Sequence, residues 1–134
     1  MSEATRAHAV LDGAPYATRI TTGGHTLVCD EGPGLGGADA GPPPFAYLLS
    51  GLIACTAITL RMYAERKGLT LRKVWVDATY HHQKEGAWIE RVLTLDGDLD
   101  DAARARMADI AERTPVTLAV KGGVEVRTRM EAVA

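Results

Sequence analysis

Cysteine is scarce in this chain, with only Cys29 and Cys55 among 134 residues. Two thiols cannot form the disulfide framework that holds small secreted domains together, so a reducing, cytoplasmic setting is expected. An excess of positive charge is also lacking, because the formal net charge is −2 and the basic residues form no run. Nucleic acids and anionic membranes attract basic surfaces, so neither is expected as a partner.

Segments typical of export or membrane insertion are lacking too. Residues 1–6 have no apolar core, so no signal peptide is expected. Residues 41–60 carry no charge, but the helical part before Arg61 has only 16 residues and contains glycine, serine and threonine. That length is short for a bilayer, and a buried core helix is predicted instead.

Motifs for metals and nucleotides are weak. His81 and His82 are neighbours in a predicted strand and face opposite sides, while His25 and Cys29 would lie about 13 Å apart along a strand. Residues 32–37 satisfy G-x-G-x-x-G, yet seven residues, three of them proline, separate this motif from the next helix. A dinucleotide site needs the glycines to lead directly into the helix. Neither a metal nor a cofactor is therefore expected.

Hydrophobic periodicity and turn residues predict a mixed order of elements. The expected strands are residues 7–11, 15–21, 25–29, 71–80, 88–95 and 124–130. The expected helices are residues 45–67 and 102–113, with a short helical or irregular piece at 117–120. This order predicts one α+β domain over residues 1–134, in which a largely antiparallel sheet wraps around a long central helix.

The long helix also predicts a dimer and contains the most informative residue. It is apolar nearly all round, which is more surface than one chain of this length can cover. Leu48, Leu52, Cys55 and Thr59 share one stripe of this helix. A thiol in such an apolar wall is either inert packing or a protected nucleophile, and the residues alone leave both open.

Several segments together resemble the OsmC/Ohr family, in its OsmC-like branch. They are GHTLVCDE at 24–31, GGADAGPPP at 36–44, Cys55 with TLRMYAERKG at 59–68, LDGDLD at 95–100 and IAERTPV at 110–116. The resemblance covers roughly residues 16–130 and implies an intertwined α+β homodimer with active sites at the interface. It also implies reduction of organic hydroperoxides by a cysteine pair, in which a thiolate is oxidised to a sulfenic acid and a second cysteine condenses with it.

By this resemblance, Cys55 matches the cysteine that reacts with the peroxide. The resolving cysteine of the family falls on Thr114, and its glutamate falls on Ala46. Arg19 is a candidate for the activating cation by its place in the first strands, and His25 stands near the expected position. Threonine cannot form a disulfide, and alanine cannot orient a cation. At most a one-cysteine peroxidase of the oxidative-stress response is expected, using an external thiol reductant and a small apolar hydroperoxide.

Two alternatives remain open at this point. The chain could be a non-catalytic dimer that binds a small apolar ligand in the same pocket, or Cys55 could serve only as packing. Cys29 is the other thiol, and it could pair with Cys55 only if their Cα atoms lie within about 7 Å.

Overall fold

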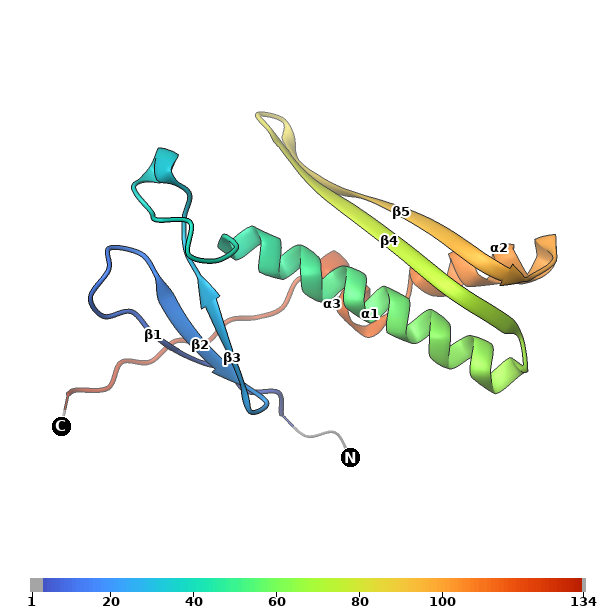
Figure 1. The fold of residues 1–134 in the computed structure, drawn as a ribbon, viewed down its shortest axis with the longest axis horizontal. Coiled ribbons are helices and arrows are strands. Elements are labelled where there is room, and N and C mark those ends of the chain that lie inside the picture. Colours follow the sequence, from blue (N-terminus) through green and yellow to red (C-terminus); the bar gives the residue numbers. More distant parts are fainter. Residues whose placement is uncertain (1–3, 134) are drawn as a thin grey trace. The chain divides into compact units, whose positions relative to one another are not determined.

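The computed structural model describes residues 4–133, and the chain divides into two compact units. The first unit ends at Ser50 and the second begins at Gly51. The boundary lies within the long helix α1 (Pro44–Lys67), which precedes an antiparallel hairpin (Figure 1). The structure therefore confirms the predicted α+β class, with antiparallel sheets and a long central helix.

The first unit contains a three-stranded antiparallel sheet in the order β1-β2-β3. Its strands are β1 (His8–Val10), β2 (Thr18–Thr22) and β3 (His25–Cys29), so the first two differ in extent from the predicted ones. Gly23 and Gly24 have φ values of 56° and 80°, which suits the tight two-residue turn between β2 and β3. The predicted hairpin is thereby confirmed.

The glycine-rich loop after β3 is organised around Asp30, whose side chain is buried. Its carboxylate accepts hydrogen bonds from the backbone N–H groups of Glu31, Ala38 and Ala40, at 2.7, 3.2 and 3.1 Å. These N–H groups, that of Ala40 first, hold the pKa of Asp30 below its ordinary value. The loop also contains the short 3-10 helix η1 (Pro33–Leu35). Residues 32–37, which match a nucleotide-binding motif, thus belong to a loop that is held by the carboxylate of Asp30.

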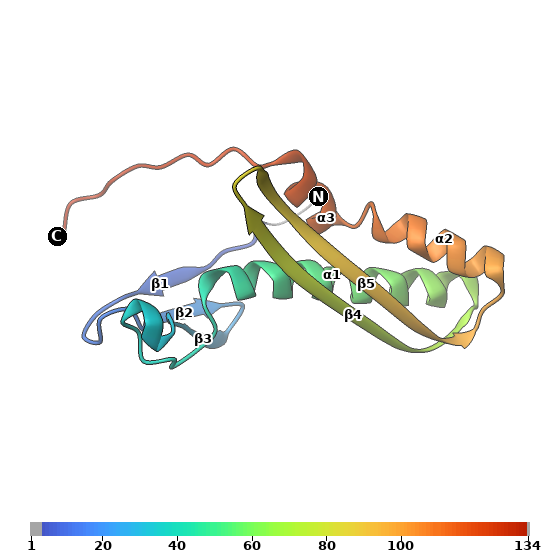
Figure 2. The same ribbon diagram turned by 90° about the horizontal axis from the view of Figure 1, so that it is seen from above.

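The second unit consists of the hairpin of β4 (Thr70–Gln83) and β5 (Gly86–Asp98) with helices against it. Both strands are longer than predicted, because the pairing continues to the turn at Gly86. The helix α2 (Asp101–Ala111) follows β5, and α1 and α2 lie along the hairpin (Figure 2). The buried core joins α1, α2 and the hairpin through Leu60 and Ala64 of α1, Leu71 of β4 and Met107 of α2.

Side-chain caps explain where the two shorter helices begin. The carboxylate of Asp100 accepts from the N–H of Ala103 at 2.8 Å and caps α2. Thr114 caps α3 (Pro115–Gly122) in the same way, and proline at the first helical position suits the start of a helix. The piece predicted as short helical or irregular is therefore a full helix.

The predicted final strand at residues 124–130 is wrong. Within the described chain, the residues from Gly123 to Val133 form neither a helix nor a strand. A strand needs a partner edge for its backbone hydrogen bonds, and no strand of the described residues pairs with this segment. Val126 and Met130 are accordingly 85% and 95% exposed.

Candidate functional site

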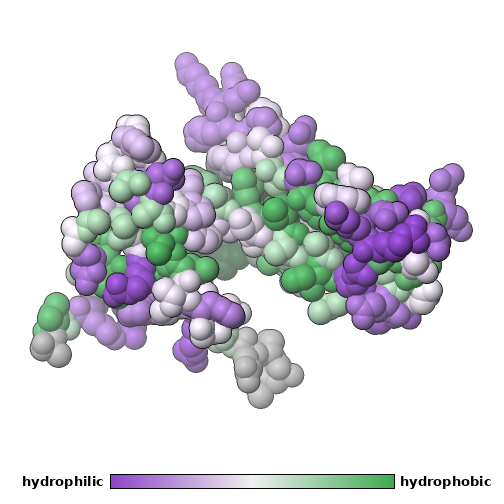
Figure 3. All heavy atoms as spheres, viewed as in Figure 1, coloured by the Kyte–Doolittle hydropathy of each residue, from purple (hydrophilic) through white to green (hydrophobic). Residues whose placement is uncertain are grey.

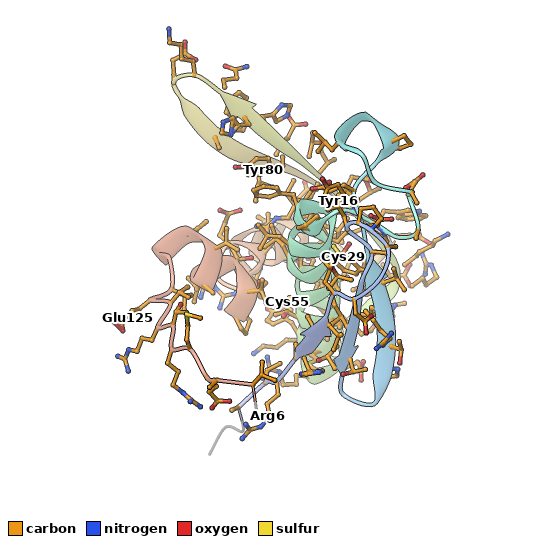
Figure 4. The ribbon with its side chains drawn as sticks, turned by 90° about the vertical axis from the view of Figure 1, so that its left-hand side faces the viewer. Arg6, Tyr16, Cys29, Cys55, Tyr80 and Glu125 are labelled. Atoms are coloured by element: carbon orange, nitrogen blue, oxygen red, sulfur yellow. The ribbon has the colours of Figure 1, made fainter. Side chains whose placement is uncertain are left out.

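Cys55 lies on α1 in the second unit and is partly exposed (Figure 4). Leu52, three residues before it, and Thr56, the next residue, are both buried. The Cys55 Sγ atom is 4.0 Å from the hydroxyl of Thr59, one turn further along the helix. The thiol thus sits at the margin of the buried stripe of α1 rather than in its centre.

A largely buried arginine on β5 is the main polar feature next to this stripe. The side chain of Arg91 is only 11% exposed. One terminal nitrogen donates to the hydroxyls of Thr56 and Thr117, at 3.0 and 2.9 Å. The other donates to the carbonyl of Ala111 at 2.8 Å and to the carboxylate of Glu112 at 3.2 Å. One guanidinium therefore ties β5 to α1, to the end of α2 and to α3.

The acceptors of Arg91 are themselves fixed by further bonds. The Thr56 hydroxyl donates to the carbonyl of Leu52 at 2.8 Å while it accepts from Arg91. The Thr117 hydroxyl lies 2.6 Å from that of Thr114 and 3.3 Å from the Ala111 carbonyl. Because arginine cannot lose its proton in a protein, the positive charge at this point is permanent.

A hollow of about 470 Å³ lies beside Arg91 within the second unit. Leu52, one turn before Cys55, is one of its apolar lining residues, whereas Cys55 itself does not line it. The ammonium of Lys121 donates to Glu112 at 2.7 Å, and this bond, supported by Arg91, holds the pKa of Glu112 below its ordinary value. The remaining walls are mostly apolar and comprise Tyr80, Ala87, Trp88, Ile89, Thr117 and Val120.

Thr114, where the resemblance places the resolving cysteine, has a structural role. Its side chain is completely buried, and its hydroxyl accepts from the N–H of Thr117 at 3.3 Å as the cap of α3. The same hydroxyl pairs with that of Thr117. A hydroxyl suits this position because it satisfies the helix N-terminus, and the position offers no thiol.

The cations predicted for the site lie in the first unit. Arg19 is an exposed residue of β2, and His25 is an exposed residue at the start of β3. Both remain predictions. The sequence reasoning missed Arg91, although strand alternation contains the signal. Ile89 and Leu93 face inward on β5, and the residue midway between them must face the same way.

The second thiol, Cys29, has the surroundings of an unreactive cysteine. It ends β3, and burial raises the pKa of its thiol, with the neighbouring carboxylates of Glu31 and Asp30 adding to the effect. Because the thiolate is the nucleophile, a raised pKa slows its reactions near neutral pH.

Two further properties concern metals and membranes. Among residues 4–133, no three histidine, cysteine, aspartate or glutamate side chains gather closely enough to hold a metal ion. By length and hydropathy alone, α1 could cross a membrane, and the core helix of a soluble protein satisfies the same criterion.

Comparisons with solved structures identify the fold. An OsmC-like protein from Mycoplasma pneumoniae has a TM-score of 0.79 and 21% identity, with 92% of this chain and 91% of that chain covered. An organic hydroperoxide resistance protein from Legionella pneumophila has a TM-score of 0.65 and 21% identity, with coverage of 93% and 94%. Another from Elizabethkingia anophelis has a TM-score of 0.67 and 17% identity, with coverage of 93% of both chains.

No curated protein matches the chain closely enough to be compared. A family model described as OsmC-like protein matches residues 36–129, a span that contains Cys55, Arg91 and Thr114. This span covers most of the chain, including the β4–β5 hairpin and the helices α1, α2 and α3. The chain therefore belongs to the OsmC-like protein family.

Proposed function

We propose that this protein is a thiol redox protein of the oxidative-stress response, in which Cys55 reduces small organic hydroperoxides with the help of an external thiol. Family membership supports this function, as do similar structures named organic hydroperoxide resistance proteins. The observation that carries the proposal is the setting of Cys55. It lies between Leu52, which lines an apolar hollow, and Thr56, which is bonded to a permanent cation.

The reaction needs only one cysteine of the protein. The Cys55 thiolate attacks one peroxide oxygen, the O–O bond breaks, and the alkoxide leaves with a proton as an alcohol. Cys55 becomes a sulfenic acid. A first external thiol condenses with it, releasing water and forming a mixed disulfide. A second external thiol then opens this bond, which returns the Cys55 thiol and leaves an external disulfide. The reaction includes no internal disulfide with position 114, because Thr114 has no sulfur.

A cation near the sulfur would stabilise the thiolate. Arg91 is a candidate because it holds Thr56, the next residue along the chain from Cys55. Arg19 and His25 remain candidates from the first unit. Because Ala46 cannot hold an arginine, the bonds that hold Arg91 to Ala111 and Glu112 could supply the orienting role.

We also propose that the functional form is a cytoplasmic homodimer, in which residues 1–134 of each chain act as a single domain. Within one chain, Ile58 and Met62 of α1 are 53% and 59% exposed. Apolar side chains also gather over the middle of the viewed face of the second unit (Figure 3). A second copy covering this face would remove the apolar area from water. Light scattering after size exclusion should give twice the chain mass of 14.3 kDa.

The decisive experiment isolates Cys55 in a Cys29→Ser background. Rapid mixing with cumene hydroperoxide should consume the thiol much faster than free cysteine is consumed at the same pH. The matched control is the Cys29→Ser/Cys55→Ser double variant, which should consume none. If Cys55 reacts only as fast as free cysteine, the enzymatic proposal is wrong.

A second candidate function is non-catalytic binding of a small apolar ligand. The hollow of about 470 Å³ favours it, as do threonine at position 114 and alanine at position 46. Native mass spectrometry of protein purified from cells would then show a retained ligand, and a Cys55→Ser variant would retain it equally. If Cys55 serves only as packing, a Cys55→Ala variant would match the parent in both assays.

A further inference from the structure

A second hollow, of about 460 Å³, lies between α1 and α2 in the second unit. Its lining comes from the last turns of α1, from α2 and from Arg113 just after α2 ends, and it shares no residue with the hollow beside Arg91. The lining residues are Tyr63, Arg66, Lys67, Arg106, Ile110 and Arg113.

The lining of this hollow carries four cations, Arg66, Lys67, Arg106 and Arg113, and no carboxylate. Asp109 forms ion pairs with Arg106 and Arg113, and a single carboxylate therefore serves two guanidinium groups. Among the described residues, Arg66 and Lys67 have no ion pair. Two of the four cations that line the hollow therefore share one carboxylate, and the other two have none.

Ordinary helix electrostatics account for only part of this arrangement. Cations in the last turn of a helix interact favourably with its dipole, which explains Arg66 and Lys67 on α1. Arg106 lies in the middle of α2, so the dipole gives no reason for it to face the same hollow. Arg72, by contrast, meets two carboxylates, Asp96 and Asp98. Mutual repulsion of the gathered cations is relieved when an anion enters between them.

We propose that this hollow binds a small polyanion, a molecule with two or more neighbouring oxyanion groups on a partly apolar body. Planar guanidinium groups match phosphate and carboxylate oxygens in pairs, which favours Arg66, Arg106 and Arg113 as direct ligands. Lys67 adds a fourth positive charge. Tyr63 and Ile110 supply an aromatic and an aliphatic surface for the rest of the ligand.

Isothermal titration calorimetry of the whole chain with pyrophosphate and with citrate, in about 0.1 M salt, tests this site. We expect at least one of the two to bind, and the Arg66→Gln/Lys67→Gln variant to weaken that binding at least about tenfold. The control variant, Lys73→Gln/Lys84→Gln, removes the same charge from β4 and its turn. It should stay within about twofold of the parent. All four side chains are exposed, so both variants should remain folded.

The two probes also separate the sources of the oxyanions. Binding of pyrophosphate alone identifies a phosphate-bearing ligand, and binding of citrate alone identifies a polycarboxylate. The proposal is overturned if neither binds, or if both variants lose affinity equally. Because the site is separate from Cys55, a Cys55→Ser variant should bind as the parent does, whatever the outcome of the peroxidase assay.

Discussion

Replacing Arg91 with methionine should destabilise the second unit strongly. Arg91 is the residue that joins β5 to α1, α2 and α3, through four hydrogen bonds from a side chain that is 11% exposed. Methionine has a flexible apolar side chain that can occupy much of the same space. The change therefore removes the bonds and the charge and leaves only a small cavity.

The magnitude follows from what each partner loses. Glu112 is 58% exposed, so its ion pair with Arg91 is screened by solvent and contributes under about 1 kcal/mol. Hydrogen bonds from a charged donor to interior acceptors contribute about 1.5–3 kcal/mol each when considered alone. In the Arg91→Met variant, however, two groups keep another hydrogen bond. The Thr56 hydroxyl still donates to the Leu52 carbonyl, and the Ala111 carbonyl still accepts from the Thr117 hydroxyl. We therefore expect a loss of about 2–3 kcal/mol, below the 3–5 kcal/mol of a pair broken to leave a buried charge.

Urea unfolding at one protein concentration measures this loss, because a dimer makes stability depend on concentration. With a slope of about 1–3 kcal/mol per molar urea, the midpoint should fall by about 0.7–3 M. Glu112→Gln is the control and should cost less than about 1 kcal/mol, since it removes the exposed partner only. If the free energy of unfolding of Arg91→Met lies within about 0.5 kcal/mol of the parent's, Arg91 does not hold the elements of this unit together, and the reasoning is refuted.

Three further predictions concern other buried groups. Thr114→Val should cost about 1–2 kcal/mol in urea unfolding through loss of the α3 cap, and Thr114→Ser should cost clearly less; equal costs would argue against capping. Met107→Ala should lower the free energy of unfolding by about 2–4 kcal/mol because Met107 is fully buried in the core. A smaller loss would mean that the core is not tightly packed around this side chain. The pKa of Asp30 is lowered in the folded chain, so its contribution is present above the unfolded value of about 3.9 and is lost as pH falls through the folded value. Thermal unfolding should therefore show the parent well above Asp30→Asn at pH 7 and the difference narrowing as the pH falls below about 3.9, whereas a constant gap would contradict the sign.

Much of the fold could be predicted because it follows from local patterns. The helix from Pro44 to Lys67 follows from a proline start, an uninterrupted apolar run and the stop at Gly68. The β4–β5 hairpin follows from alternation, although its length did not, because pairing continues wherever a partner strand is present. The segment at residues 124–130 shows the reverse case. Its alternation is real, but no strand edge of the described residues pairs with it.

The candidate site was predictable only in part. Cys55 stands out because a thiol in an apolar helix is unusual enough to examine, and Thr114 because it replaces an expected cysteine. Arg91 was overlooked because a lone arginine in a strand usually faces solvent, and its burial depends on acceptors that come from three other elements.

The local sequence determined the span of α1, the two hairpins and the position of the Cys55 thiol on the long helix. Periodicity and turn chemistry act within a few residues, so they can be read without knowing what lies across the core. Only the tertiary structure brought Thr56, Ala111 and Thr117 together around Arg91, and Tyr63 together with Arg106 and Arg113. Those contacts join residues far apart in the chain, and the distance between such residues is decided by how the elements pack rather than by any pattern within them.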